Sequence, residues 1–354
     1  MKIKKKNLLI ITIILGLSSV GVFYYTTKDH KEEKNTKETT TSYSSKSIKK
    51  MEDLGIKNKV DTKKYNKTLD TAIFDESFSK NYVEYYLGVK YYDNKNLISY
   101  INNLAKDGSS INEINEIFEK FIKYKNFDIN NAKRYLSYSF KNKDLDNQDI
   151  VTRVNLSLDK PYYTDTKKIE NQSDIFALVN KYNYVSTTYV PSNLKSLFNI
   201  SSLKMVDVAA DAYEEFVKGA KADGITFIGT TAYRSAAWQK ELYDSYVNRD
   251  GVEKADTYSA RPGYSEHQLG YSVDLNDPNY KEKRISPSDY EWIKNNAYKY
   301  GFIIRYPEGK ENITGYSEEN WHLRYVGKDV AKEIHDKNIT FDEYYDLYIK
   351  EYNN

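Results

Sequence analysis

The sequence predicts an α+β fold, in which a small antiparallel sheet is flanked by helices and preceded by a separate helical module. Beyond about residue 174, helical and short β-rich segments mix without the regular βαβ repeat of a parallel sheet. Upstream of that point the apolar residues recur at helical spacing. The chain has 354 residues, 40% of them hydrophobic, which is ample material for more than one core.

The N-terminal residues 1–27 are predicted to anchor the protein in the cell membrane. Four lysines in the first six positions precede an uncharged, mainly apolar run from Leu8 to Tyr25. That run reaches the lower limit for crossing a bilayer and exceeds most signal-peptide cores. Because flanking lysines stay on the cytoplasmic side, everything after Tyr25 is expected outside the cell. No clear A-x-A site follows, which favours a retained anchor over a cleaved signal that would leave the protein secreted.

Residues 28–50 are predicted to be a flexible tether, because charged, Ser and Thr side chains dominate and apolar ones are almost missing. The first 50 residues carry a net charge of +7, which leaves −5 for the rest. A mildly acidic body disfavours nucleic acid as a partner. The sequence contains no cysteine, which excludes disulfides, thiolate metal sites and a cysteine nucleophile. Metal chemistry must therefore use histidine and carboxylates.

Residues 51–173 are predicted to form a helical, tyrosine-rich module of unknown role. Ser110 and Glu113 have the spacing of a capping box ahead of an apolar helix. Upstream, residues 83–105 read as one helix with Gly108 just beyond its end. The segment has no histidine and its carboxylates are scattered. A spacer or a wall- or partner-contacting domain is the expected use.

Residues 174–354 are predicted to carry the sheet and the chemistry. Ser286 followed by Pro287 is typical of a helix start, and Gly301 of its end. The expected helices are 203–222, 236–248, 287–300 and two at the C-terminus, and the expected strands are 225–231, 271–275, 302–306 and 321–325. The helix 236–248 is expected to bury Trp238, Leu242, Tyr243 and Tyr246.

Two of the four histidines have positions that indicate no special role. His30 lies in the predicted tether, and His335 lies on a polar stretch of a late helix, where a solvated histidine is expected. By contrast, His267 ends a loop marked by Gly and Pro, and His322 begins a separate predicted strand.

Asp274 is the carboxylate best placed to join these two histidines. It lies on the predicted strand 271–275, on the face shared with Ser272 and opposite the apolar residues. Gly270 lets the chain turn, so His267 and Asp274 can converge on one ion. Two histidines and one aspartate leave the fourth zinc position to water, as in catalytic sites. Spacing alone also permits two ordinary hydrogen-bonded histidines.

Three segments narrow the alternatives: TAYRSAAWQ (231–239), YSARPGYSEHQLGYSVDL (258–275) and RYPEGKENITGYSEENWHLRYVG (305–327). In this order and separation they resemble the VanY-type D-alanyl-D-alanine carboxypeptidases, zinc peptidases related to the VanX dipeptidases and to L,D-carboxypeptidases. The resemblance covers about residues 175–350. The S-x-H-x₂-G-x₃-D element paired with E-x-W-H is its specific part.

The resemblance implies one Zn²⁺ ion held by His267, Asp274 and His322. It also implies Glu319 as the catalytic carboxylate and Arg234 as an arginine beside the scissile bond. Donors for the free carboxylate of the substrate are expected from the same matching segments, with a turn or cap role as the alternative for each; the candidates are Gln239, Ser259 and Ser265.

Neighbouring residues are expected to play lesser parts. Glu318 is expected to be solvated, because the three-residue offset to the ligand histidine favours Glu319 as the base. Glu266, next to His267, either contacts a ligand residue from behind or lies at the surface; the surface is expected, since adjacent residues on an extended chain point apart. Asn320 stands where the family often has Pro. Tyr306 and Trp321 are expected to form cleft wall and core.

The family resemblance implies a zinc-dependent D,D-carboxypeptidase that removes the C-terminal D-Ala from peptidoglycan stem peptides or their precursors outside the membrane. Two alternatives share the fold, namely an L,D-carboxypeptidase and a wall endopeptidase. A catalytically silent wall-binding module is a further alternative from another class.

Overall fold

The structure is a computed structural model that describes residues 41–280 and 284–352. Residues 43–354 form one compact unit. Within the described ranges, no helix is both long and apolar enough to cross a bilayer. The predicted anchor at 1–27 and His30 lie outside these ranges.

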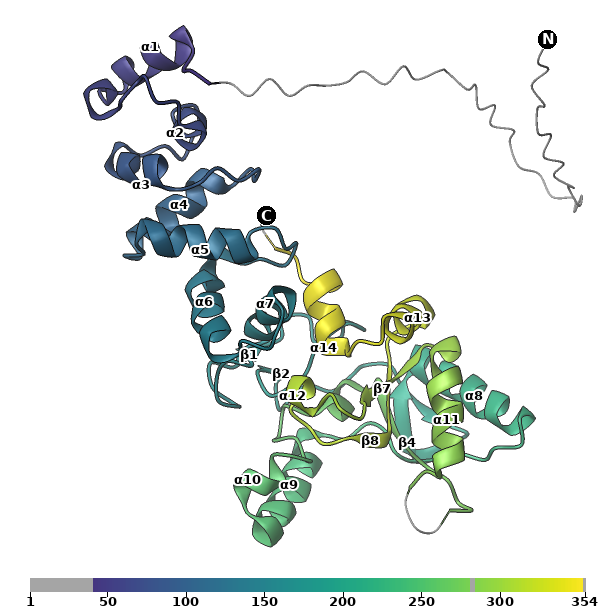
Figure 1. Ribbon diagram of the computed structural model, residues 1–354. Helices are drawn as coiled ribbons and strands as arrows, with labels where there is room; N and C mark the ends of the chain where they lie inside the picture. The colour runs from purple at the N-terminus through teal and green to yellow at the C-terminus, as the bar shows by residue number, and fades with distance from the viewer. Residues whose placement is uncertain (1–40, 281–283, 353–354) are drawn as a thin grey trace, which may run out of the picture. The chain divides into compact units, whose positions relative to one another are not determined.

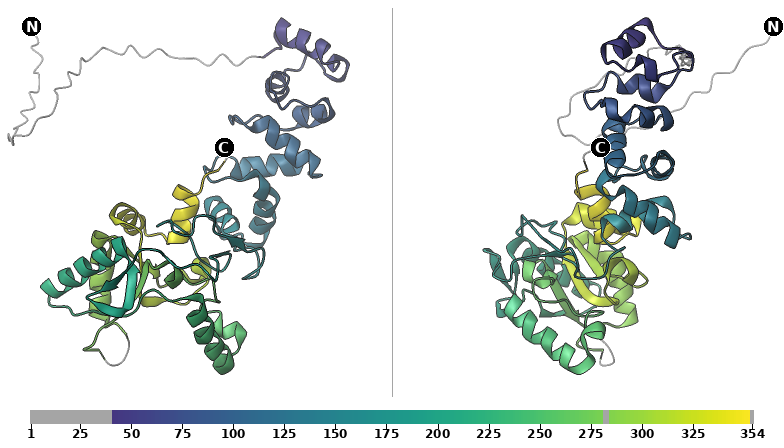
Figure 2. Two further views of the ribbon diagram at one scale, coloured as in Figure 1. Left: turned by 180° about the vertical axis from the view of Figure 1, so that it is seen from behind. Right: turned by 90° about the vertical axis from the view of Figure 1, so that its left-hand side faces the viewer.

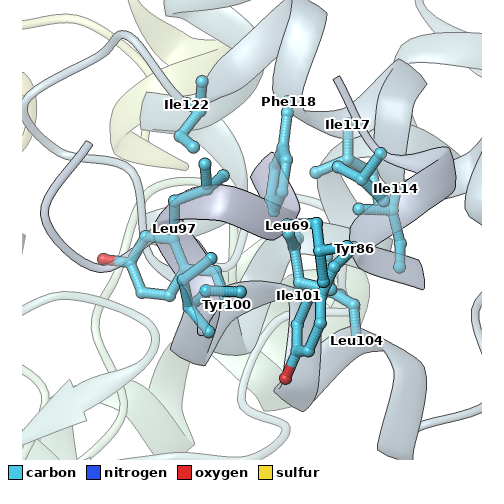
Figure 3. Close-up of a cluster of buried hydrophobic side chains, with 14 of the residues drawn as sticks. Leu69, Tyr86, Leu97, Tyr100, Ile101, Leu104, Ile114, Ile117, Phe118 and Ile122 are labelled. Atoms are coloured by element: carbon cyan, nitrogen blue, oxygen red, sulfur yellow. The ribbon is translucent and has the colours of Figure 1, made fainter. Parts of the chain in front are cut away.

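The first part of the described chain is a run of short helices (Figure 1). They are α1 (Ser45–Asp53), η1 (Lys57–Lys59), α2 (Lys67–Ala72), η2 (Lys80–Tyr82), α3 (Val83–Gly88), α4 (Leu97–Lys106), α5 (Ile111–Phe121), η3 (Ile129–Asn131), α6 (Ala132–Lys141) and α7 (Asn147–Asn155). Their apolar faces share one core, part of which is drawn in Figure 3 around Leu69, Tyr86 and Phe118. The capping box at Ser110 and Glu113 is confirmed.

Two predicted boundaries in this part are wrong. The end of the predicted tether, residues 45–50, belongs to α1, because Ser44 caps the helix and Met51 anchors it in the core. Residues 83–105 form two helices instead of one. Helix α3 ends at Gly88, where the Asn115 side chain accepts from the amide of Lys90 and donates to the carbonyl of Gly88. These bonds replace helical ones and allow the chain to turn.

The helical module contains a repeated hydrogen-bond motif that the sequence analysis did not detect. The Tyr86 hydroxyl accepts from the amide of Ser79 at 3.1 Å and donates to Asn102 Oδ1 at 2.5 Å. One repeat later, the Tyr135 hydroxyl accepts from the amide of Asp128 at 3.0 Å and donates to Asn155 Oδ1 at 2.5 Å. In each case the asparagine also donates to a backbone carbonyl, that of Ser77 or Asn126. Helices α2 to α4 and α5 to α7 are therefore two copies of one unit.

The rest of the chain forms the α+β part, which confirms the predicted class. Its helices are α8 (Asp207–Ala222), α9 (Ala236–Asp250), α10 (Val252–Ala255), η4 (Glu266–Leu269), α11 (Pro287–Asn296), η5 (Ala297–Tyr300), α12 (Glu311–Thr314), α13 (Lys328–Lys337), α14 (Phe341–Tyr344) and the π-helical turn η6 (Tyr345–Ile349). Its strands are β1 (Lys167–Lys168), β2 (Asn183–Tyr184), β3 (Leu194–Leu197), β4 (Ile200–Val206), β5 (Ile228–Thr231), β6 (Ser272–Asn276), β7 (Phe302–Tyr306) and β8 (Glu319–Tyr325).

The central sheet is antiparallel, with strand order β5-β6-β8-β7. Strands β3 and β4 form a separate antiparallel pair, and β1 and β2 a short parallel one. Helices α8 and α11 lie beside each other (Figure 1; Figure 2 gives two further views), and Phe216 and Trp292 join them with ring centroids 5.5 Å apart. This apolar layer covers one side of the sheet and leaves its polar groups for the other.

Two predictions for this part need correction. The predicted helix 203–222 begins only at Asp207, because residues 200–206 pair with β3 as strand β4. Helix α9 does not bury Trp238, which is 48% exposed; its buried residues are Ala236, Gln239 and Tyr243. A polar residue therefore takes the inward position on α9, and it does so at the site.

The repeated tyrosine motif generates a stability prediction. Tyr135→Phe deprives the amide of Asp128 and the side chain of Asn155 of a partner, so we expect a loss of about 1–3 kcal/mol in unfolding free energy. Urea denaturation followed by circular dichroism measures it. Tyr86→Phe is the matched change in the other repeat and should cost a similar amount. A wild-type midpoint for both variants would contradict a stabilising role for the motif.

Candidate active site

Two histidines and one aspartate meet at the centre of the sheet. Asp274 on β6 lies directly opposite His322 on β8 in the antiparallel register. His267 comes from η4, the 3₁₀ turn that precedes β6. The turn between them depends on Gly270, which has φ +76°, and a Cβ there would lie 3.1–3.3 Å from three side chains. All three residues are buried, and their ligand atoms lie within 4.8 Å of one another.

In each histidine one ring nitrogen, the inner one, lies near Asp274, and the other, the outer one, lies on the far side of the ring. His267 Nε2 and His322 Nδ1 lie 3.3 and 3.2 Å from Asp274 Oδ1. His267 Nδ1 lies 2.7 Å from the carbonyl oxygen of Ala232, an acceptor that fixes the proton on Nδ1 and leaves Nε2 free to bind a metal. Asp274 Oδ1 is buried without a hydrogen-bond partner. This donor set fits one zinc ion with three protein ligands.

The electrostatics of the cluster also suit a cation. Burial and the neighbouring Arg234 lower the pKa of His267 to about 4. Burial works to lower the pKa of His322 as well, but Asp274 and Glu266 outweigh it and raise this pKa to about 9. Both imidazoles share the Asp274 carboxylate. A metal ion at the shared point would replace the proton on His322.

Glu319 lies at the edge of this cluster, at the start of β8. Its Oε2 atom is 3.5 Å from His322 Nδ1. Burial raises the pKa of Glu319 to about 7, although the charge on His322 works against the shift. A carboxyl group with a pKa near neutrality can both accept and donate a proton under working conditions. Glu319 therefore has the position and the proton affinity of a general acid/base.

Arg234 is held next to the same carboxylate. Its Nη2 atom lies 3.8 Å from Asp274 Oδ2, and its Nη1 donates to Gln239 Oε1 at 2.7 Å. Gln239 in turn donates to the carbonyl of Ala260 at 2.7 Å and to Ser259 Oγ at 3.4 Å. These bonds use both amide hydrogens. Gln239 therefore orients Arg234 while it also lines the cavity, and its expected role as a donor to the substrate stays a prediction.

These groups line one cavity of about 480 Å³. The predicted residues Arg234, Gln239, Ser259 and Ser265 all line it, as do Glu318 and Glu319. Tyr306 and Trp321 also line it, and the ring of Tyr306 lies 5.2 Å from that of His322. The structure thus brings together every residue that the sequence singled out for the site. His335 is not among them and stacks on Tyr298 on a separate surface.

Arg284 is a cavity residue that the sequence analysis missed. Its Nη1 atom lies 3.6 Å from Asp274 Oδ2, and its guanidinium lies over the ring of Trp321 at 5.0 Å. It precedes the helix start at Ser286 in a polar segment, so no motif marks it. Two arginines consequently flank Asp274 on the side that faces the cavity.

Glu266 differs most from its expected position. It is 1% exposed, and its Oε1 accepts from Arg305 Nε at 2.7 Å and lies 3.2 Å from Arg324 Nη1. Its Oε2 lies 3.8 Å from His322 Nε2. The expectation of a surface residue assumed an extended chain, whereas η4 turns Glu266 inward beneath the site. Although burial opposes it, Arg305 and Arg324 lower the pKa of Glu266 and keep it charged.

Comparison with known proteins matches this region to one family. The family model VanY, D-alanyl-D-alanine carboxypeptidase, matches residues 202–328, which contain all of the site residues above. The Bacillus subtilis (strain 168) protein YodJ is 41% identical over 207 residues, which are 54% of this chain and 76% of that protein. A D-alanyl-D-alanine carboxypeptidase of Enterococcus faecalis is 34% identical over 47% of this chain and 64% of its own length.

Among solved structures, that of the LD-carboxypeptidase LdcB is 39% identical and covers 52% of this chain and 91% of its own, with a TM-score of 0.48. VanYB in complex with D-alanine-D-alanine is 32% identical and covers 49% and 98%, with a TM-score of 0.44. The match to the Bacillus protein covers more than two thirds of that protein at 41% identity. The chain belongs to the VanY-type D-alanyl-D-alanine carboxypeptidase family.

Proposed function

We propose that this chain is a zinc-dependent D,D-carboxypeptidase that removes the C-terminal D-Ala from peptidoglycan stem peptides. The observation that carries the proposal is the buried group His267, Asp274 and His322, with Glu319 beside it, inside the segment that the family model matches. Two Enterococcus relatives named as D-alanyl-D-alanine carboxypeptidases support the choice of bond.

His267 Nε2, a carboxylate oxygen of Asp274 and His322 Nδ1 would hold one zinc ion. When bound, zinc supplies a Lewis acid that lowers the pKa of water and polarises the carbonyl of the penultimate residue. Glu319 accepts the proton of the attacking water, and its pKa near 7 lets it return that proton to the departing amine.

Arg234 stabilises the negative charge that develops on the carbonyl oxygen. Arg234 is 8% exposed and its guanidinium is already oriented by Gln239, so no reorganisation is needed when the charge forms. Gln239, Ser259 and Ser265 remain candidates for binding the free carboxylate of the substrate, because all three line the cavity. Gln239 also positions Arg234.

The function is tested by weighing the products from two wall peptides. With zinc present, the purified protein should release D-Ala from a stem pentapeptide ending in D-Ala-D-Ala and leave the corresponding tetrapeptide intact. Mass spectrometry of timed samples distinguishes the two. Loss of D-Ala from the tetrapeptide alone would instead identify an L,D-carboxypeptidase. Cleavage within a cross-linked peptide would identify an endopeptidase, and no cleavage would leave a wall-binding role.

Glu319→Gln is the control for the mechanism in the same assay. It should lower turnover by at least about 100-fold, the range of a general acid/base contribution, while retaining zinc. Glu318→Gln changes the adjacent carboxylate and should keep activity within a fewfold of the wild type. Equal losses in the two variants would show that Glu319 is not the base.

The location outside the cytoplasmic membrane is also part of the proposal. The apolar run from Leu8 to Tyr25 behind four lysines supports insertion with the remainder of the chain outside. In bacterial cells making the full chain, the protein should sediment with membranes and resist carbonate extraction, whereas deletion of residues 2–27 should release it. Recovery of the full chain from the soluble fraction would contradict an anchor.

A further inference from the structure

Two arginines are completely buried beneath the candidate metal site. Arg305 on β7 and Arg324 on β8 are both 0% exposed, although neither lines the cavity. Both contact Glu266 Oε1. Arg324 is further fixed by backbone carbonyls, since its Nη2 donates to that of Ile175 at 2.8 Å and its Nε to that of Tyr325 at 3.1 Å. Arg305 depends on side-chain carboxylates.

The first turn of α14 supplies the second carboxylate. Asp342 Oδ2 accepts from Arg305 Nη1 at 2.6 Å, and Asp342 Oδ1 accepts from Asn180 Nδ2 at 3.0 Å. The preceding residue, Phe341, lies beside both guanidinium groups. The centroid of its ring is 5.7 Å from Arg305 Cζ and 5.4 Å from Arg324 Cζ. A capping box formed by Thr340 and Glu343 fixes this turn.

A continuous set of charged contacts therefore runs from α14 to the metal site. Asp342 contacts Arg305, and Arg305 contacts Glu266. Glu266 Oε2 lies 3.8 Å from His322 Nε2, a buried nitrogen that has no hydrogen-bond partner among the described residues. The outer nitrogen of a ligand histidine is normally oriented by a hydrogen-bond acceptor, and Glu266 is the carboxylate placed for that task. The family model ends at residue 328, so Asp342 lies outside the matched segment.

We propose that Asp342 is a positioning residue for the metal site, which holds Arg305 so that Glu266 remains available to His322. The inference rests on the proposed function only in naming zinc as the ion. With Asp342 present, the two guanidinium groups are balanced by two carboxylates. Without Asp342, Glu266 is the one carboxylate left in this group to balance the two arginines. A net positive charge then remains beneath the cation site.

Both consequences weaken metal binding. Arg305 competes with His322 for Glu266, which loosens the orientation of the imidazole, and the unbalanced charge repels a divalent cation. Because the cluster is excluded from water, solvent screens this charge poorly. Loss of an outer-shell partner typically costs about 10–100-fold in metal affinity.

The chain offers a matched control in the same C-terminal segment. Asp346 is also 1% exposed and is also bonded to an asparagine, Asn126, at 2.6 Å. Its hydrogen-bond partners are Asn126, Asn155 and Tyr352, none of which belongs to the charged contacts beneath the site. Asp342→Asn and Asp346→Asn therefore each remove one buried carboxylate charge, of which only the first is connected to the site.

The test is the zinc dissociation constant of metal-free wild type, Asp342→Asn and Asp346→Asn, measured in competition with a chromogenic chelator. We expect Asp342→Asn to bind zinc at least about tenfold more weakly and Asp346→Asn to stay within twofold of the wild type. Thermal unfolding of the metal-free proteins records the stability cost of each change. Equal zinc affinity in all three proteins, or equal losses in both variants, would overturn the proposal.

Asp342→Glu provides the rescue and a safeguard against misfolding. It keeps the charge but displaces it by one methylene, so its zinc affinity should lie between those of the wild type and Asp342→Asn. If Asp342→Asn does not fold, Asp342→Ser removes the same charge with a smaller side chain, and wild-type zinc affinity in that variant overturns the proposal. Failure of the proposed function is distinguishable, because a wild type that binds zinc but releases no D-Ala leaves the affinity comparison unaffected.

Discussion

The pairing of β6 with β8 is the constraint on which the site depends. In this register Asp274 faces His322 across two antiparallel strands, and the turn at Gly270 brings His267 to the same point. A shift of either strand by one residue would send its side chain to the opposite face of the sheet. The apolar neighbours Val273 and Leu323 occupy that opposite face in the core. Packing of the core therefore fixes the geometry of the ligands.

Four charged side chains are buried beneath the site, and each is paired with a group of opposite charge. Arg305, Arg324, Glu266 and Asp342 are all buried, and such ion pairs seldom add net stability because their desolvation costs several kcal/mol per ion, on the order of the attraction gained. Their retention below the sheet is better explained by orientation of the site than by stability. The apolar cores of both parts of the chain supply the stability.

The sequence motifs identify the site residues, whereas the roles of some of them depend on contacts that form only in the folded chain. His267, Asp274, His322, Glu319 and Arg234 occur in short segments whose spacing and resemblance identify them, and the structure assembles them around one cavity. The sequence marks Gln239 as a candidate substrate donor, but its bonds to Arg234 and Ala260 are seen only in the fold, where the second of them joins residues 21 positions apart. Glu266 was placed at the surface because the 3₁₀ turn that buries it has no clear local signal. The break after Gly88 depends on Asn115, which is equally remote from it.

In the proposed site, His267, Asp274 and His322 together bind one zinc ion. A crystal structure of the zinc-loaded protein, with anomalous difference maps on both sides of the zinc absorption edge, tests it most directly. We predict a single peak about 2.0–2.2 Å from His267 Nε2, His322 Nδ1 and a carboxylate oxygen of Asp274, with His322 Nε2 directed to Glu266. A peak bound through His322 Nε2, or one located away from these three residues, would contradict it.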